Sequence, residues 1–128
     1  MDRLVWPAAA KFVEAEFGVT PYLKTEVGAE YNLSSPGPGL DHAIGDLKRI
    51  VQIAKPEMII IVGHSGCLGW HQFVDPDVEE EAHRMALSGA ASIVGRMVAP
   101  GVKLAVGYFL KNSQVMKWWQ LMGRLVQR

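Results

Sequence analysis

Residues 59–69 have the sequence IIIVGHSGCLG, in which a short β-branched run stops at a glycine and is followed by a histidine and a cysteine. A continuous apolar run of this length with a turn signal after it predicts a strand that is buried on both faces. Residues just past the carboxyl end of such a strand lie where open parallel α/β sheets bind ligands. An imidazole and a thiolate spaced as His64-x-x-Cys67 at that place can bind a soft metal such as zinc.

The segments on either side of this run alternate between helical and strand patterns. Helical spacing and helix-boundary residues predict helices at 7–17, at 40–54, from 76 to the Pro100-Gly101 pair, and at 114–126. Strands are expected at 22–27, 59–62 and 102–110. This order predicts one domain over residues 1–128, an α/β fold of three layers with a mostly parallel β-sheet and helices on both faces.

Net charge, apolar content and cysteine count limit the partners and the cellular compartment expected for this chain. The formal net charge is zero, so electrostatic attraction to nucleic acid or to an anionic membrane is expected to be weak. No segment has the ~18 apolar residues of a membrane span, and the N-terminus lacks the pattern of a secretory signal. A single cysteine excludes an intrachain disulfide and suits a reducing, cytoplasmic compartment. A hydrophobic content of 49%, with four Trp and six Met, predicts a homo-oligomer, a dimer or higher, that buries apolar surface.

The order of these segments resembles the β-class carbonic anhydrases. The stretch from His64 to Cys67 is similar to the second zinc-ligand motif of that family, His-x-x-Cys. Val27-Gly28-Ala29 lies where the family has an Asn-Ala-Gly turn, and residues 104–108 resemble its late strand, which usually contains a glycine. The resemblance covers most of the chain, from the N-terminus to the start of the last expected helix.

This resemblance implies a zinc cofactor and the reversible hydration of carbon dioxide to bicarbonate, a lyase activity. Members of the family bind zinc through two cysteines, one histidine and either water or an aspartate. The implied metal ligands in this chain are His64, Cys67 and Asp2, a set of three with an open position. The backbone near Gly28 and Gly66 is expected to line a small substrate pocket.

The chain departs from the family at its first motif, Cys-x-Asp-x-Arg, whose Asp and Arg form a dyad beside the metal. When Asp2 is matched to the family's aspartate, Leu4 stands at the arginine position, and Arg3 is one residue early. The cysteine of the motif would precede Met1. Asp2 and Arg3 are therefore the candidate catalytic pair. The departure leaves open a degenerate, non-catalytic member of the fold that acts as a binding or assembly protein without metal.

The candidate residues also have ordinary structural interpretations. Cys67 alone fits a small buried hydrophobe, or the reactive thiol of a redox enzyme or sensor. His64 can serve as a hydrogen-bonding residue of the turn. His42 is expected on the polar face of a helix, and His71 at the surface or an interface. Glu79 and His83, four apart among three glutamates, suggest a solvated helix face. The stripes Met85–Met97 and Trp118–Trp119 are expected in the core or against a second subunit.

Overall fold

A computed structural model describes residues 5–18, 37–66, 75–98, 100–121 and 124–125. Its elements in chain order are α1 (Val5–Phe17), α3 (Pro38–Ala54), β1 (Met58–His64), α4 (Pro76–Ile93), the π-helix η1 (Val94–Val98), β2 (Lys103–Leu110), β3 (Val115–Leu121) and β4 (Arg124–Leu125). The four strands form one sheet in the order β1-β2-β3-β4. β1 and β2 are parallel, whereas the other two pairs are antiparallel. The fold is therefore α/β, but its described sheet is mixed rather than mostly parallel.

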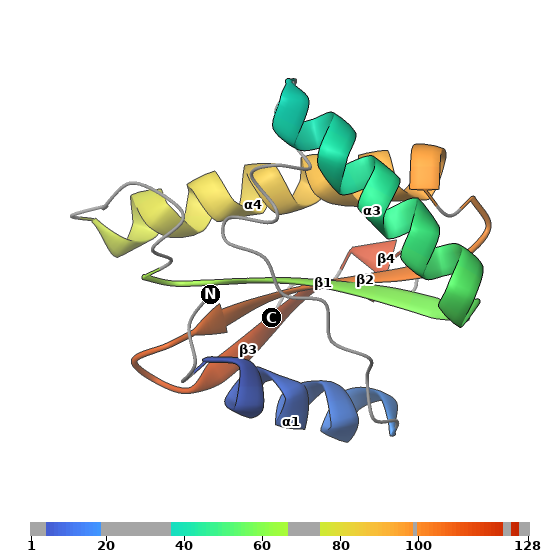
Figure 1. The fold of residues 1–128 in the computed structure, drawn as a ribbon. Helices are drawn as coiled ribbons and strands as arrows, with labels where there is room; N and C mark the ends of the chain where they lie inside the picture. Colours follow the sequence, from blue (N-terminus) through green and yellow to red (C-terminus); the bar gives the residue numbers. More distant parts are fainter. Residues whose placement is uncertain (1–4, 19–36, 67–74, 99, 122–123, 126–128) are drawn as a thin grey trace.

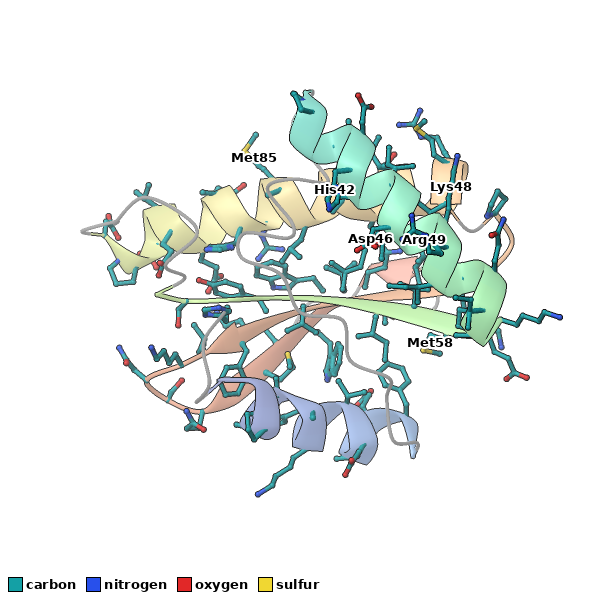
Figure 2. The ribbon with its side chains drawn as sticks, viewed as in Figure 1. His42, Asp46, Lys48, Arg49, Met58 and Met85 are labelled. Atoms are coloured by element: carbon teal, nitrogen blue, oxygen red, sulfur yellow. The ribbon has the colours of Figure 1, made fainter. Side chains whose placement is uncertain are left out.

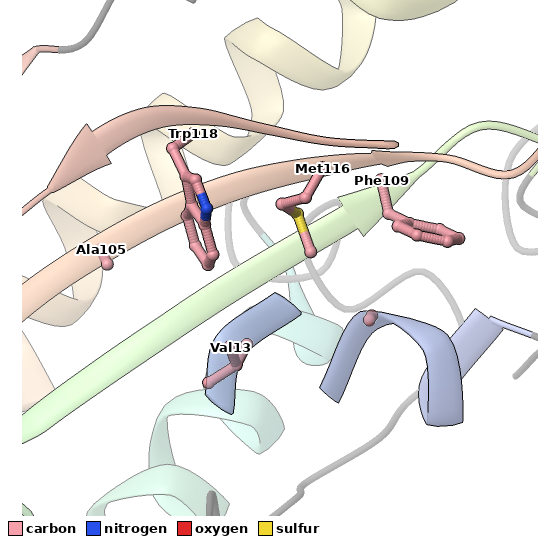
Figure 3. Packing of buried hydrophobic residues seen from close by; sticks show 6 residues of the cluster. Val13, Ala105, Phe109, Met116 and Trp118 are labelled. Carbon is pink, nitrogen blue, oxygen red and sulfur yellow. The ribbon is translucent and has the colours of Figure 1, made fainter. Parts of the chain in front are cut away.

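Helices cover both faces of this sheet (Figure 1). Helix α1 lies against one face, and α3 and α4 lie over the other. The side chains of β2 alternate between the two sides, because successive residues of a strand point to opposite faces. Ala105 and Phe109 pack with Val13 of α1, together with Met116 and Trp118 of β3 (Figure 3). On the other side, a separate cluster contains residues of α4, β2 and β3: Leu87, Ala91, Val106, Tyr108 and Trp119.

The apolar run that begins at Ile59 is divided between the two sides in the same way. Ile60 and Val62 pack against the α1 cluster. Ile59 and Ile61 pack against a cluster built from α3, α4 and η1. The strand predicted to be buried on both faces thus has packing partners on each face, although the side chains from Ile59 to Val62 are half-buried.

The predicted end of α3 at residue 54 and the predicted start of α4 at residue 76 are confirmed, whereas α3 begins two residues early, at Pro38, and α4 ends at Ile93 and is followed by the π-helix η1. Pro38 lies in the first turn of α3, where its missing N–H leaves no helical hydrogen bond unmade. The helix ends at Lys55, whose φ of 48° is left-handed and whose N–H donates to the carbonyl of Val51 at 2.9 Å. At the start of α4, Oδ1 of Asp75 accepts the N–H of Asp77 at 2.9 Å, a side-chain cap.

The helix predicted for residues 114–126 is wrong. Residues 115–121 form β3, which pairs antiparallel with β2 across a turn at residues 111–114. The N–H of Gln114 donates to the carbonyl of Leu110 at 2.8 Å, and Gln114 takes a left-handed φ of 56°. Trp118 faces α1, and Trp119 faces α4. The two adjacent tryptophans are thus buried on opposite faces of the sheet, because successive side chains of a strand point to opposite sides. In a helix, the same two side chains would not point in opposite directions.

The predicted apolar face of α4 is also only partly right. Met85 and Met97 are 70% and 47% exposed, so neither belongs to the core of the chain. Figure 2 shows Met85 pointing away from the sheet. Helix α4 instead packs against the sheet through the large side chains of Leu87 and His83 together with small residues such as Ala91. None of the helices in the described part of the chain combines the length and apolar character needed to cross a membrane.

Candidate functional site

His64 is the last residue of β1 and lies beside Phe109 of the parallel strand β2. Its side chain is on the same face as those of Ile60 and Val62, since residues two apart along a strand share a face. His64 is 5% exposed, which makes it one of two buried polar residues in the described core. The structure thus places this candidate ligand at the carboxyl end of a covered strand, as the sequence predicts.

One hydrogen bond indicates that Nδ1 of the His64 ring carries a proton. Nδ1 lies 2.8 Å from the backbone oxygen of Ser65. A carbonyl oxygen can only accept, so Nδ1 carries the proton, and in the neutral ring the lone pair is on Nε2. Metal-binding histidines commonly donate their second nitrogen to a backbone carbonyl or a carboxylate in this way. His64 therefore fits the role of a zinc ligand through Nε2.

The turn after His64 is held by three further hydrogen bonds. The N–H of Ser65 donates to the carbonyl of Phe109 at 3.0 Å, which extends the β1–β2 pairing by one residue. The hydroxyl oxygen of Ser65 accepts the N–H of Lys111 at 2.8 Å. The N–H of Gly66 donates to Oε2 of Glu79 at 3.0 Å, and Gly66 has a φ of 63° that favours glycine. Strand β2, the turn at 111–114 and α4 all hold this turn.

Apart from His64 and Gly66, the predicted site residues lie outside the part of the chain that the structure describes. Outside the described residues lie Asp2, Arg3, Gly28, Cys67 and His71, and also the strand expected at 22–27. Gly66 is described and exposed, within the turn itself. Within the described ranges, no three His, Cys, Asp or Glu side chains are grouped closely enough to hold a metal ion. Of the predicted ligands, the structure therefore positions His64.

The prediction of a solvated face is wrong at His83, whereas Glu79 is half-buried. His83 is 0% exposed, and its ring lies 5.2 Å from that of Tyr108. The glutamate binds the turn after β1 instead. A signal was available in the sequence, because His83 shares a helical stripe with Leu87 and Ala90, which are both buried against the sheet. His42 is exposed on α3, as expected (Figure 2).

Charged and aromatic groups join α4 to β3 next to this turn. Nζ of Lys117 lies 2.7 Å from Oε1 of Glu80. The guanidinium carbon of Arg84 lies 4.3 Å from the centre of the Trp119 ring, and that ring stacks on Tyr108 at 5.0 Å. These contacts fix α4 against the sheet, and with it the carboxylate of Glu79.

Comparison with protein-family models, with curated proteins and with solved structures gives no match. The residues at the end of β1 and their geometry are therefore the basis for a functional proposal. They provide a buried histidine in a defined tautomer, on a turn that is tied to three neighbouring parts of the fold.

Proposed function

We propose that this chain is a β-carbonic-anhydrase-like protein that binds zinc and catalyses the reversible hydration of carbon dioxide to bicarbonate. The observation that carries the proposal is His64, buried at the carboxyl end of β1 with Nδ1 bonded to a backbone carbonyl. Cys67 follows three residues later and would supply a thiolate. A neutral imidazole and a thiolate are donors that suit zinc, and a carboxylate from Asp2 would bring the set to three.

Each residue has a defined task in this proposal. His64 and Cys67 hold the metal, while Asp2 either completes the ligand set or orients the attacking water. Arg3 is the candidate partner of Asp2, and the backbone at Gly28 and Gly66 borders the substrate. Zinc in a site of this kind lowers the pKa of a water molecule far enough for attack on carbon dioxide near neutral pH.

The wider parts of the proposal follow from the same resemblance and from the composition of the chain. They are a β-carbonic-anhydrase-like arrangement of the layers, assembly as a homodimer or larger oligomer, and a cytoplasmic location. Leu4 at the family's arginine position supports a second candidate, a degenerate member that binds or assembles without metal and without catalysis. The two candidates differ in whether zinc is bound and whether turnover depends on it.

Zinc content and turnover test the proposal together. Protein purified without chelator is expected to contain about one zinc ion per chain and to hydrate carbon dioxide in a zinc-dependent manner. His64→Ala and Cys67→Ser each remove a proposed ligand, so both should weaken zinc binding by more than the roughly 10–100-fold typical of outer-shell changes. Zinc is measured by elemental analysis and chelator competition, and turnover by stopped-flow with a pH indicator.

His42→Ala is the matched control, because His42 is an exposed histidine on α3. Its zinc affinity and turnover should equal those of the unchanged protein. A folded protein that binds no zinc and shows no zinc-dependent turnover would remove the enzyme proposal and favour the degenerate member.

A further inference from the structure

The Ser65–Gly66 peptide is held on both sides by side chains. Its carbonyl oxygen, on Ser65, accepts Nδ1–H of His64 at 2.8 Å. Its N–H, on Gly66, donates to Oε2 of Glu79 at 3.0 Å. None of the described peptide bonds is cis, and in a planar trans peptide the C=O and N–H point in opposite directions. One peptide unit therefore connects the carboxylate of α4 to the histidine of β1.

This chain of groups resembles a carboxylate–histidine pair with a peptide inserted between its members. A hydrogen bond to an ionised carboxylate is generally stronger than a neutral one, and the bond from Gly66 to Glu79 is solvent-exposed and 3.0 Å long. Hydrogen bonds in series polarise one another, so the carboxylate makes the Ser65 carbonyl a stronger acceptor for His64. It also fixes the plane of the peptide, and so the direction in which that carbonyl meets the imidazole.

The anchoring of both ends makes the arrangement rigid. Ser65 is tied to β2 through its N–H to Phe109 and to the 111–114 turn through its hydroxyl, which accepts from Lys111. Glu79 lies in the first turns of α4, a helix fixed against the sheet by fully buried residues such as Leu87. The packing of α4 against the sheet therefore holds the Glu79 carboxylate in position to accept the hydrogen bond from Gly66.

We propose that Glu79 is a positioning residue for His64: through the Ser65–Gly66 peptide it holds the imidazole in the Nδ1–H tautomer and in one orientation. The functional consequence of this inference rests on the proposed function, because the Nδ1–H tautomer matters there as the form in which Nε2 binds zinc. The effect on the ring itself can be measured without metal. Glu79 does not touch the substrate in this scheme, and its influence reaches the metal only through His64.

The test compares three variants of the full chain. Glu79→Ala removes the acceptor, Glu79→Gln keeps an acceptor oxygen without the charge, and Glu81→Ala removes a neighbouring glutamate that is 66% exposed. Nitrogen-15 NMR of the metal-free protein at alkaline pH reports the His64 tautomer, with the signal assigned by its loss in His64→Ala. Competition with a chromophoric chelator reports zinc affinity. Circular dichroism checks that each variant is folded.

The unchanged protein and Glu81→Ala should show Nδ1–H at His64. Glu79→Ala should show a mixture of tautomers and a zinc affinity lower by about 10–100-fold, the usual range for an outer-shell partner. Glu79→Gln should keep most of the zinc affinity that Glu79→Ala loses, because its amide oxygen can still accept the hydrogen bond from Gly66. If Glu79→Ala acted only by destabilising the whole fold, the retained acceptor would not be expected to restore the affinity. An Nε2–H ring in the unchanged protein, or unaltered tautomer in Glu79→Ala, would overturn the inference. A Glu79-dependent Nδ1–H ring without any zinc affinity would uphold it and reject the proposed metal site.

Discussion

Gly107 lies in the centre of β2, where the structure leaves no room for a side chain. A Cβ at this position would lie 2.9 Å from Sδ of Met116 and 3.0 Å from two ring carbons of Trp118. Both neighbours belong to the buried cluster that α1 covers, so neither can move without disturbing its own packing. Gly107→Ala is expected to lower the free energy of unfolding by about 1–3 kcal/mol, as measured by urea titration.

Gly45→Ala is the matched control, since a Cβ at this exposed helical position meets no atom within 4 Å. Alanine is the better helix former, so this variant should gain about 0.5–1 kcal/mol. Equal urea midpoints for the two variants would show that the close packing of β3 side chains against Gly107 does not exclude a larger residue at this position.

Helix α3 ends on a residue that is poorly suited to its backbone. Lys55 has a φ of 48°, a left-handed conformation that costs an L-residue roughly 1–2 kcal/mol and costs glycine almost nothing. Glycine is also the commonest residue where helices end in this way. Lys55→Gly is therefore expected to raise the free energy of unfolding by about 0.5–1 kcal/mol, after the greater freedom of glycine in the unfolded chain is subtracted.

The control for this element is Lys48→Gly, in the interior of the same helix (Figure 2). There the backbone is right-handed, and glycine should cost about 1 kcal/mol. Thermal or urea midpoints should therefore move in opposite directions for the two lysines. A loss of stability in Lys55→Gly would mean that the helix does not end in the left-handed turn.

At the scale of the whole molecule, helices pack against both faces of the sheet, α1 on one face and α3 and α4 on the other. Leu87 lies in the α4 layer with 0% exposure, and Val13 lies in the α1 layer with 5%. Leu87→Ala should cost about 2–5 kcal/mol, and Val13→Ala about 2 kcal/mol because it removes fewer apolar atoms. Since β2 contributes side chains to both layers, each variant should unfold in a single transition.

Coincident midpoints by circular dichroism and by tryptophan fluorescence would establish this cooperativity. Neighbouring residues of β2 face opposite layers, as Tyr108 and Phe109 do, so loss of one layer weakens the strand that supports the other. An early fluorescence transition confined to Val13→Ala would show instead that the α1 layer unfolds independently.

The sequence by itself determined the local features of this protein. Consecutive β-branched residues from Ile59 to Val62 predict a strand with apolar neighbours on both faces, Pro56 follows the end of α3, and Pro76 begins α4. The position of His64 at the end of that strand follows from the same pattern. Each of these features depends on neighbours within a few residues, and so they can be predicted without knowledge of the rest of the fold.

Only the tertiary structure decided which distant segments meet. The apolar spacing at residues 115–121 suits a helix or a strand, and pairing with β2 selected the strand. In the same way, Glu79 and His83 look like one solvated face in the sequence, yet one binds Gly66 and the other is buried beside Tyr108. These outcomes depend on contacts between residues far apart in the chain, whose burial and hydrogen bonds outweigh local preference.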